Sequence, residues 1–535
     1  MWAYFRIVKQ ATLTLFPFFV AMRFGHEAAD IHRMRHTRAE HRTSAIGEAS
    51  RTGEAITLMV VKTLSDRPVA VALMFAALVS AELTCSLESG MIYVAMSGLY
   101  EQYGDPVSVG WLLTAFTLTA AASAEVSGRL GDLFGRRRVM LIMLVIAFTG
   151  SMLSALHSEL EWIIAGRAIQ GVSMAILPLG FGILRENLDE RHLGLGVSLI
   201  GATYTVGGGI GVIIGGLVVD FWHWQGLFFI SAGMALFSIC FVLAVIPPSK
   251  PTSDESGLDI IGGVLFAPAV AIVLYGLVEG AGNGWTPVTL CLVAGGIALL
   301  AFWAWYELRH PNPLIDIRLL GRSQVRLANL NIFAISLGPL LGPAIYLPFL
   351  QQPVWTGIGF GITATMAAIV KIPANVLASI AALGSGAVSK RVPVRTLMII
   401  SAVASLVGWA GLAGVHSNFW LSVSMIVILI VPAGSVLLVL TPQLVIGAVP
   451  EARTSEATGL TQVVRAFSKA VGLQVIALGL ASAQVSSSDG TTTFPGPSGY
   501  ILVFLACAAL SAWSLILMLR LPRPDKGQGG VANAA

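Results

Sequence analysis

A small set of charged side chains lies inside the long apolar stretches of this chain. If those stretches cross a membrane, each charge at the bilayer centre costs roughly 2.5–3.5 kcal/mol even on the most lenient scale. Each therefore needs a partner or a water-filled cavity, and such residues usually mark the path of an ion, a proton or a substrate. The set comprises the carboxylates Glu82, Glu88 and Glu125 and the cations Arg167, Lys371, Arg465 and Lys469.

The composition shows what kind of element must carry these charges. The chain has 535 residues, of which 56% are hydrophobic and only 11% charged, with a mean hydropathy of +0.81. A helix needs about 20 apolar residues to cross a bilayer core, and the absence of period-2 alternation favours helices over a membrane barrel. We predict 14 transmembrane helices over 69–97, 108–127, 139–156, 161–183, 195–219, 226–246, 259–279, 287–306, 328–350, 360–385, 396–415, 419–446, 457–481 and 499–519.

Loop charge supports this count of helices. Alternate loops hold all the Lys and Arg residues that follow residue 67 and lie outside the predicted helices, and basic loops face the cytoplasm. The pattern predicts a multi-pass protein of the plasma (inner) membrane with both termini in the cytoplasm. The loops predicted outside hold no Lys or Arg and lie near 98–107, 157–160, 220–225, 280–286, 351–359, 416–418 and 482–498.

The first 67 residues differ from the rest of the chain. Their apolar run 11–22 is too short to span a bilayer and resembles a signal-peptide core, but no clear cleavage site follows it. One interpretation of His32, His36 and His41 is that they are metal ligands. The alternatives are that they belong to a solvated cytoplasmic extension, or that the start codon has been assigned too far upstream. We expect the extension, with no metal, no cofactor and no nucleic-acid partner. The four cysteines are isolated in apolar runs and predict no disulfide framework.

Glu88 is the predicted proton-coupling carboxylate. At 1.5 Å per residue it lies about 14 Å below the outer face, and Arg167 lies about 9–10 Å below the same face. Desolvation favours the protonated carboxyl and a neighbouring cation favours the ionised one, so a conformational change that alternates the two would couple protons to transport. The alternatives are a static buried ion pair between the two residues, and Glu82 as the principal carboxylate.

The remaining cations predict a substrate site. Arg465 and Lys469 are spaced i, i+4 and share a helix face, and Lys371 lies near mid-depth of its segment. We predict that they face a central cavity and favour an anionic or carboxylated amphiphile. Either lysine is open to snorkelling or pairing with Glu82 instead. Gln170 is a further candidate cavity contact, with interhelical hydrogen bonding as its alternative.

Short motifs relate the chain to a known family. "GRLGDLFGRRRVM" (128–140) matches the segment 2–3 signature of the major facilitator superfamily. "RAIQGVSMA" (167–175) looks like its segment-four motif, and "LESGMIYVAM" (87–96) resembles the segment-one motif of its 14-helix drug/proton antiporters, with Glu88 in place of the usual Asp. "ELRHPNPLIDIRLL" (307–320) and "EATGLTQVVRAFSKAVG" (456–472) are also similar to that subfamily. The resemblance covers about 75–520.

The resemblance implies a gate at the 128–140 signature. We expect Asp132 to hold a helix N-terminus or an arginine of the facing bundle in one state and release it in the other. The gating residues predicted on this basis are Glu125, Gly128, Asp132, Gly135, Arg136 and Arg137. "GAVSKRVPVR" (386–395) is a weak internal echo that places Lys390 opposite Asp132 and Arg395 opposite Arg137.

One departure bears on direction. The segment-five motif of exporters contains Gly-Pro-x-x-Gly-Gly, and here Val212 replaces the proline. Export is therefore less firmly implied than transport. The glycines predicted to let segment five approach its neighbours are Gly207, Gly211, Gly215 and Gly216.

These observations predict an all-α polytopic membrane protein with the major facilitator fold: two six-helix bundles and two inserted helices. The predicted divisions are a cytoplasmic extension (1–67), an N-terminal bundle (68–247), the inserted helices (248–322), a C-terminal bundle (323–520) and a tail (521–535). No lysine follows a glycine, which excludes a Walker A loop, and no nucleophile elbow or zincin box indicates an enzyme. We predict a monomeric, proton-coupled secondary transporter that exports lipophilic or amphipathic small molecules, an anionic one being a candidate, by alternating access, as a multidrug-efflux antiporter does. The alternatives are uptake of an organic anion by proton symport and a non-transporting sensor on the same fold.

Overall fold

The computed structural model describes residues 68–188, 190–249, 260–309, 317–389, 391–449, 454–488 and 492–521. The expectations for the first 67 residues, including the three histidines, and for the tail after residue 521 lie outside the described residues.

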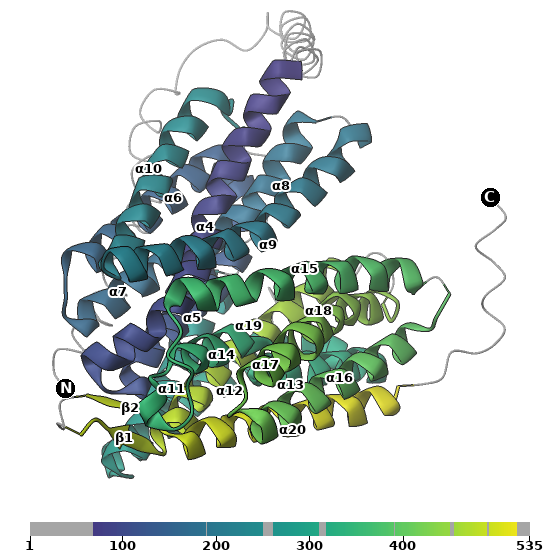
Figure 1. Ribbon diagram of the computed structural model, residues 1–535. Coiled ribbons are helices and arrows are strands. Elements are labelled where there is room, and N and C mark those ends of the chain that lie inside the picture. The colour runs from purple at the N-terminus through teal and green to yellow at the C-terminus, as the bar shows by residue number, and fades with distance from the viewer. Residues whose placement is uncertain are drawn as a thin grey trace, which may run out of the picture.

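The N-terminal part of the described chain is entirely helical (Figure 1). Its first helix, α4, is unusually long and continues past the predicted end at residue 97 to Tyr103. The elements are α4 (Pro68–Tyr103), α5 (Pro106–Phe134), α6 (Arg136–Leu156), α7 (Leu160–Gln170), the 3-10 turn η1 (Gly171–Ala175), α8 (Ile176–Asn187), α9 (Glu190–Phe221) and α10 (Gln225–Val245).

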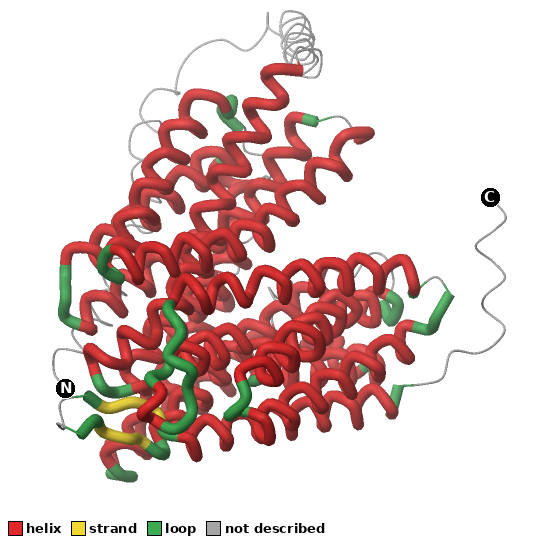
Figure 2. Tube along the Cα trace, in the orientation of Figure 1, coloured by secondary structure: helices red, strands yellow, loops and turns green. Residues whose placement is uncertain are grey.

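The remaining chain adds more helices and one small hairpin (Figure 2). The hairpin pairs β1 with β2 in antiparallel register, Val485 opposite Phe494. The elements are α11 (Ile260–Asn283), α12 (Pro287–Arg309), η2 (Ile317–Gly321), α13 (Ser323–Leu337), η3 (Pro339–Leu341), α14 (Gly342–Gln351), η4 (Val354–Thr356), α15 (Ala364–Val388), α16 (Val394–Val415), α17 (Phe419–Ser424), the π-helix η5 (Met425–Ile430), α18 (Val431–Ile446), α19 (Thr454–Ala481), β1 (Gln484–Ser486), β2 (Thr493–Pro495) and α20 (Pro497–Leu519).

Every one of the 14 predicted segments coincides with a helix or an interrupted helix. In the described chain, 13 helical spans are long and apolar enough to cross a membrane, and α11 contributes a shorter apolar stretch, Pro268–Gly280. The prediction of an all-α, multi-pass membrane protein with about 14 helices is confirmed.

Three segments predicted as continuous helices are interrupted. The fourth contains η1, the ninth breaks at Gly338 and Pro339, and the twelfth contains the π-helix η5 just before Pro432. Proline lacks the N–H that would continue the α-helical ladder, and π segments often accompany such local adjustments. The sequence prediction read only apolarity and missed these backbone changes.

The helices form two groups that meet at one end and diverge at the other (Figure 1). We name the meeting end the hairpin end, because β1 and β2 lie there. The opposite end, which carries Arg136, Arg137, Arg322 and Arg395, is named the basic end. The N-terminal bundle comprises α4–α10, and the C-terminal bundle comprises α13–α20.

The apolar cores follow the same division. One core cluster joins both bundles and includes Met91 of α4 with Leu350 and Ala367 of the C-terminal bundle. A second cluster contains only N-terminal residues, from Met74 to Ile246, and another contains only C-terminal residues, from Ile332 to Leu521. A further cluster joins Leu118 of α5 to residues of α11, α12, α13 and α19, among them Ala470. The bundles therefore share core contacts at the hairpin end and at the middle of α5, and each also has a core of its own.

Two arginines make equivalent contacts at the basic end. Arg137 donates to the carbonyl of Leu243 near the end of α10, at 2.8 Å. Arg395 donates to the carbonyls of Met518 and Leu519 at the end of α20, at 3.2 and 2.7 Å. These are the positions equated by aligning the segment at 386–395 with the motif at 128–140, and each arginine satisfies helix C-terminal carbonyls within its own bundle.

Candidate functional site

A glycine-lined crossing positions α4 against α9. A Cβ added to Gly211 would lie 3.0 Å from the carbonyl oxygen of Leu87, and one on Gly215 would lie 2.9 Å from that of Met91. A Cβ added to Gly207 would meet the side-chain hydroxyl of Ser86, whereas one on Gly216 would lie 2.8 Å from the carbonyl oxygen of Ala364 of α15. Three of the four predicted packing glycines therefore lie against the helix that carries Glu82 and Glu88, and the fourth lies between the bundles.

The Glu88 carboxylate is buried and held by two hydroxyls. Ser151 of α6 donates to Oε1 at 3.2 Å, and Ser173 of η1 donates to Oε2 at 2.8 Å. Glu88 is 2% exposed and both serines are fully buried. A serine hydroxyl both donates and accepts, and its proton rotates to suit its partner. The same pair can therefore satisfy an ionised carboxylate or a protonated carboxyl.

Arg167 lies beside this group and reaches its carboxylate only through other residues. Its guanidinium donates to Gln170 Oε1 at 3.0 Å, to the Leu112 carbonyl at 3.2 Å and to the Glu88 backbone carbonyl at 3.4 Å. Gln170 Nε2 then donates to Ser151 Oγ at 2.7 Å, which completes a relay from guanidinium to carboxylate. The predicted pairing of Glu88 with Arg167 is thus indirect.

Gln170 makes hydrogen bonds to Arg167 and to Ser151 of the neighbouring helix, which was the alternative to a contact in the cavity. Both ends of its amide are engaged in the relay and its side chain is fully buried. The face of the Phe116 ring covers the guanidinium of Arg167 at 4.2 Å, a cation–π contact that is strengthened by burial. We call Glu88, Ser151, Arg167, Gln170 and Ser173 the polar cluster.

Close backbone packing fixes the geometry of the polar cluster. Cβ atoms on Gly150 and Gly166 would each lie under 3 Å from a backbone oxygen of the other's helix, at 2.7 and 2.6 Å. Gly171, at the start of η1, fits against the carbonyl of Phe116 in the same way. Helices α5, α6 and α7 therefore approach closely enough for Ser151 to reach Gln170.

Glu82 lies six residues before Glu88 on α4 and has a different environment. It is fully buried, and neither carboxylate oxygen has a hydrogen-bond partner among the described residues. Tyr204 of α9 lies within electrostatic range of it. A buried carboxylate without a partner is costly, and the cost is greatest when the group is ionised.

The predicted cations of the C-terminal bundle face the N-terminal bundle. Lys371 Nζ lies 6.0 Å from the centre of the Tyr93 ring on α4. Arg465 lies within electrostatic range of Tyr204, and Lys469 within that of Cys85. All three side chains are partly exposed. They therefore approach α4 and α9 from α15 and α19.

The predicted gating motif is only partly described. The side chains of Glu125 and Asp132 lie outside the described residues, and so does Lys390, whereas the helical backbone of α5 includes Gly128. Gly135 has φ +88° and separates α5 from α6. Arg136 forms an ion pair with Glu186 at 3.1 Å and donates to the Gly182 carbonyl at 2.8 Å. Both contacts lie within the N-terminal bundle.

The sequence reasoning missed a hydrogen-bonded contact between the bundles at the hairpin end. The two carboxylate oxygens of Asp220, at the end of α9, accept from Ala364 N at 3.0 Å and Thr365 N at 2.8 Å, at the start of α15. The contact joins the two bundles and caps a helix N-terminus with a negative charge. Asp220 lies in a predicted outer loop, and nothing in the sequence relates it to residue 364.

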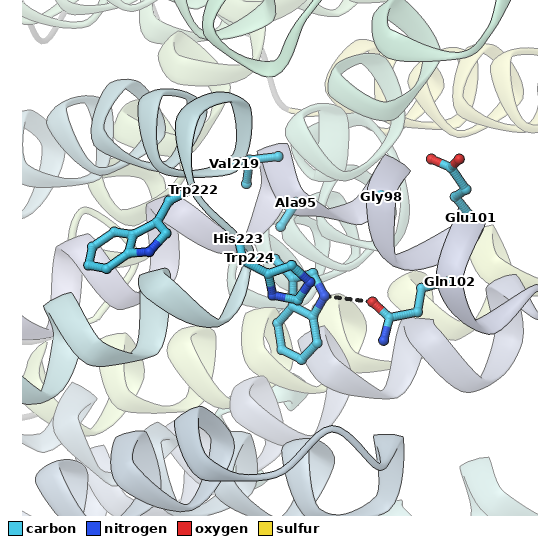
Figure 3. A pocket seen from close by; sticks show the side chains of 8 residues that line it. All are labelled: Ala95, Gly98, Glu101, Gln102, Val219, Trp222, His223 and Trp224. Carbon is cyan, nitrogen blue, oxygen red and sulfur yellow. Dashed lines mark hydrogen bonds between the residues drawn. The ribbon is translucent and has the colours of Figure 1, made fainter.

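A pocket of about 350 Å³ opens at the same end, away from the polar cluster (Figure 3). It lies between α4 and the turn from α9 to α10, and Trp224 Nε1 donates to Gln102 Oε1 at 2.7 Å across it. Trp222 on its rim is 72% exposed, as in the aromatic belts at membrane interfaces. The pocket is lined by Ala95, Gly98, Glu101, Gln102, Val219, Trp222, His223 and Trp224.

Comparison with known proteins places this architecture in a family. The sequence profile of the Major Facilitator Superfamily matches residues 78–473. A Mycobacterium tuberculosis protein named multidrug resistance protein B homolog is 29% identical over 283 residues, 51% of this chain and 52% of that protein. The probable actinorhodin transporter of Streptomyces coelicolor is 26% identical over 321 residues, 58% of this chain and 54% of that protein. The chain thus matches about half the length of these curated relatives.

Solved structures share the fold at low identity. A mutant of the nucleoside transporter NupG superposes with a TM-score of 0.56 at 15% identity, covering 84% of this chain and 99% of that one. A peptide transporter POT in complex with sulfate gives 0.60 at 14% identity, covering 83% and 93%. Both likenesses concern the fold alone.

Proposed function

Because the chain belongs to the Major Facilitator Superfamily and is a membrane transporter rather than an enzyme, we propose that it exports lipophilic or amphipathic small molecules in exchange for protons. The direction of transport in this proposal, which is export, is inferred from the relatives that are named for multidrug resistance. The basic end would face the cytoplasm, as the positive-inside rule predicts, in the plasma membrane of a bacterium. In this orientation, the two bundles would be joined at the outer face of the membrane.

The polar cluster is the single observation that supports proton coupling. Glu88 is a buried carboxyl whose two hydroxyl partners can serve either protonation state. Arg167 is one relay away, so a small change in the Gln170 bridge alters how strongly its charge acts on the carboxylate. A proton taken up in one conformation is thereby released in the other.

Glu82 and the 128–140 motif have separate parts in this proposal. Glu82, buried without a partner among the described residues, would be a second proton site or a charge that the substrate meets. The motif would act as the gate at the basic end, with Arg136 holding α6 to α8 through Glu186. Alternating access would then exchange closure at the hairpin end for closure at the basic end.

The test is transport in proteoliposomes with a cationic, a neutral and a carboxylated dye, namely rhodamine 6G, Nile red and pyrenebutyrate. We expect a pH gradient to drive movement of at least one dye with proton flux of opposite sign. Glu88→Gln should reduce gradient-driven transport more than tenfold while dye exchange between equilibrated compartments continues.

The matched control is Glu101→Gln, which neutralises an exposed carboxylate on the same helix and should leave transport unchanged. Undiminished substrate-coupled proton flux in Glu88→Gln would remove Glu88 from the mechanism. Proton and dye movement in the same direction would replace antiport by symport.

A further inference from the structure

We infer that the substrate carries an anionic group, which Lys371, Arg465 and Lys469 bind from the C-terminal bundle. This inference rests on the proposed transport function and names the chemistry of its substrate. Each of the three cations lies inside a membrane-spanning helix, on α15 or α19. Within the described part of the chain, none of them has an ion pair or a hydrogen bond.

Helical geometry argues against a lipid-facing role for Lys371. The large apolar residues of α15 that are most exposed recur at helical spacing and define its outer side. At 100° per residue, Lys371 lies on the opposite side, beside the buried Ala367 and Ala378. That side faces α4, where Tyr93 lies. The exposed outer residues are Met366, Ile369, Val376, Ile380 and Leu383.

Arg465 and Lys469 form a second basic group on one face of α19. They are one turn apart, and the exposed Gln462 lies on the same face. Tyr204 and Cys85 of the N-terminal bundle lie within electrostatic range of Arg465 and Lys469 respectively. Both of these lie toward the basic end from Tyr93, so the cations occupy different depths along α4.

The chemistry of one guanidinium and two ammonium groups predicts the charge of the substrate. A guanidinium offers a planar pair of donors to a carboxylate, sulfonate or phosphate, and an ammonium adds a point charge. None of these three partly buried cations is in ion-pair contact with a carboxylate of the described residues, Glu82 included, and an anion that joins them would offset the cost of burying their charge. Opposite them, the partly exposed rings of Tyr93 and Tyr204 offer apolar surface to the rest of an amphiphile.

An anionic substrate also determines how much charge crosses the membrane in each exchange, and this can be measured independently of binding. Exchange of one proton moving inward for one monovalent anion moving outward transfers two positive charges inward. The same exchange with a neutral substrate transfers one, and symport of one proton with the anion transfers none. An inside-negative potential therefore accelerates anion export by this protein and leaves such symport unchanged.

The primary test is equilibrium binding to the purified full-length protein in detergent, by fluorescence of pyrenebutyrate and of its uncharged analogue pyrenebutyramide. We expect the wild type to bind the carboxylate at least tenfold more tightly than the amide. Lys371→Gln, Arg465→Gln and Lys469→Gln should each reduce that ratio at least threefold without weakening amide binding. Lys469→Arg should retain it.

The control is Arg391→Gln, which removes an exposed arginine of the same bundle and should leave the ratio unchanged. Equal binding of carboxylate and amide by the wild type, no binding of the carboxylate, or equal losses for both ligands in the lysine variants would overturn the anion site. Unweakened amide binding by each glutamine variant excludes misfolding as the cause of a loss, and retention in Lys469→Arg shows that the positive charge is what matters.

Binding also separates this inference from the proposed function. Glu88→Gln should keep the carboxylate preference and lose gradient-driven transport. A protein that prefers the carboxylate and moves no protons would retain the anion site and reject proton coupling. A proton-coupled protein without that preference would retain proton coupling and reject the anion site.

Discussion

The third and fourth segments of each bundle cross at a glycine, and the residue that follows this glycine differs between the bundles. In the N-terminal bundle Gly150 meets the backbone of Gly166, and the next residue is Ser151, which binds Glu88. In the C-terminal bundle Gly408 meets Ile430, and the next residue is Trp409, which is fully buried 6.2 Å from the ring of Phe504. Similar packing thus supports a hydrogen-bonded cluster in one bundle and an aromatic core in the other.

This difference between the two crossings bears on where protons and substrate charge would be handled. The N-terminal crossing holds a carboxyl and a guanidinium in a connected network, whereas the cations of the C-terminal bundle lie outside its aromatic core and face the opposite bundle. Proton chemistry and substrate charge would then be handled by different bundles. Substitutions at equivalent places should therefore have unequal effects.

The largest effect is expected from Arg167→Met. The guanidinium is 1% exposed and donates to the Leu112 carbonyl and Gln170 Oε1, which lose their donor in the variant. We expect a loss of more than about 3 kcal/mol in stability and of gradient-driven transport. Thermal unfolding in detergent and proteoliposome flux measure the two losses. Normal stability would show that the network does not support the fold.

A matched pair of alanine substitutions compares the two crossings directly. Gly150→Ala places a Cβ 2.7 Å from a backbone oxygen, which cannot yield, whereas Gly408→Ala meets the Ile430 side chain at the same distance. We expect Gly150→Ala to cost about 1–3 kcal/mol and to reduce transport, and Gly408→Ala to cost less. Equal losses in thermal stability would contradict the distinction between the crossings.

Asp220→Asn should change the balance of conformations more than stability. The amide keeps one acceptor for the start of α15 but loses the charge that interacts with the helix N-terminus, worth about 0.3–1 kcal/mol. Spin labels at Glu101 and Val354, on opposite bundles at the hairpin end, should show a larger population of long distances. An unchanged distance distribution would exclude Asp220 from holding this end closed.

The smallest effect on transport is expected from Trp409→Phe. The indole N–H has no hydrogen-bond partner within the described ranges, so only packing is lost, at about 1–2 kcal/mol. Dye transport by the folded variant should equal that of the wild type. Strongly reduced transport would mean that the aromatic core takes part in the cycle.

The sequence predicts the helices better than it predicts their contacts. Apolar length and loop charge were sufficient for the 14 segments, and depth alone placed Glu88 and Arg167 in one region. The Gln170–Ser151 bridge depends on how closely Gly150 and Gly166 approach, which no linear pattern records. The cap by Asp220 was missed for the same reason, since it depends on residues 364 and 365, which are distant in sequence. The interrupted helices were missed because the prediction used apolarity and gave no weight to local prolines such as Pro339 and Pro432.

The two equivalent arginines at the basic end bear on how the molecule moves. Arg137 and Arg395 each fasten the start of one helix to the last helix of its own bundle. Each bundle is therefore braced internally at its basic end. If the bundles rotate as rigid bodies, contacts between them would break and form in turn at the two ends, and both arginine contacts would persist because each lies within one bundle.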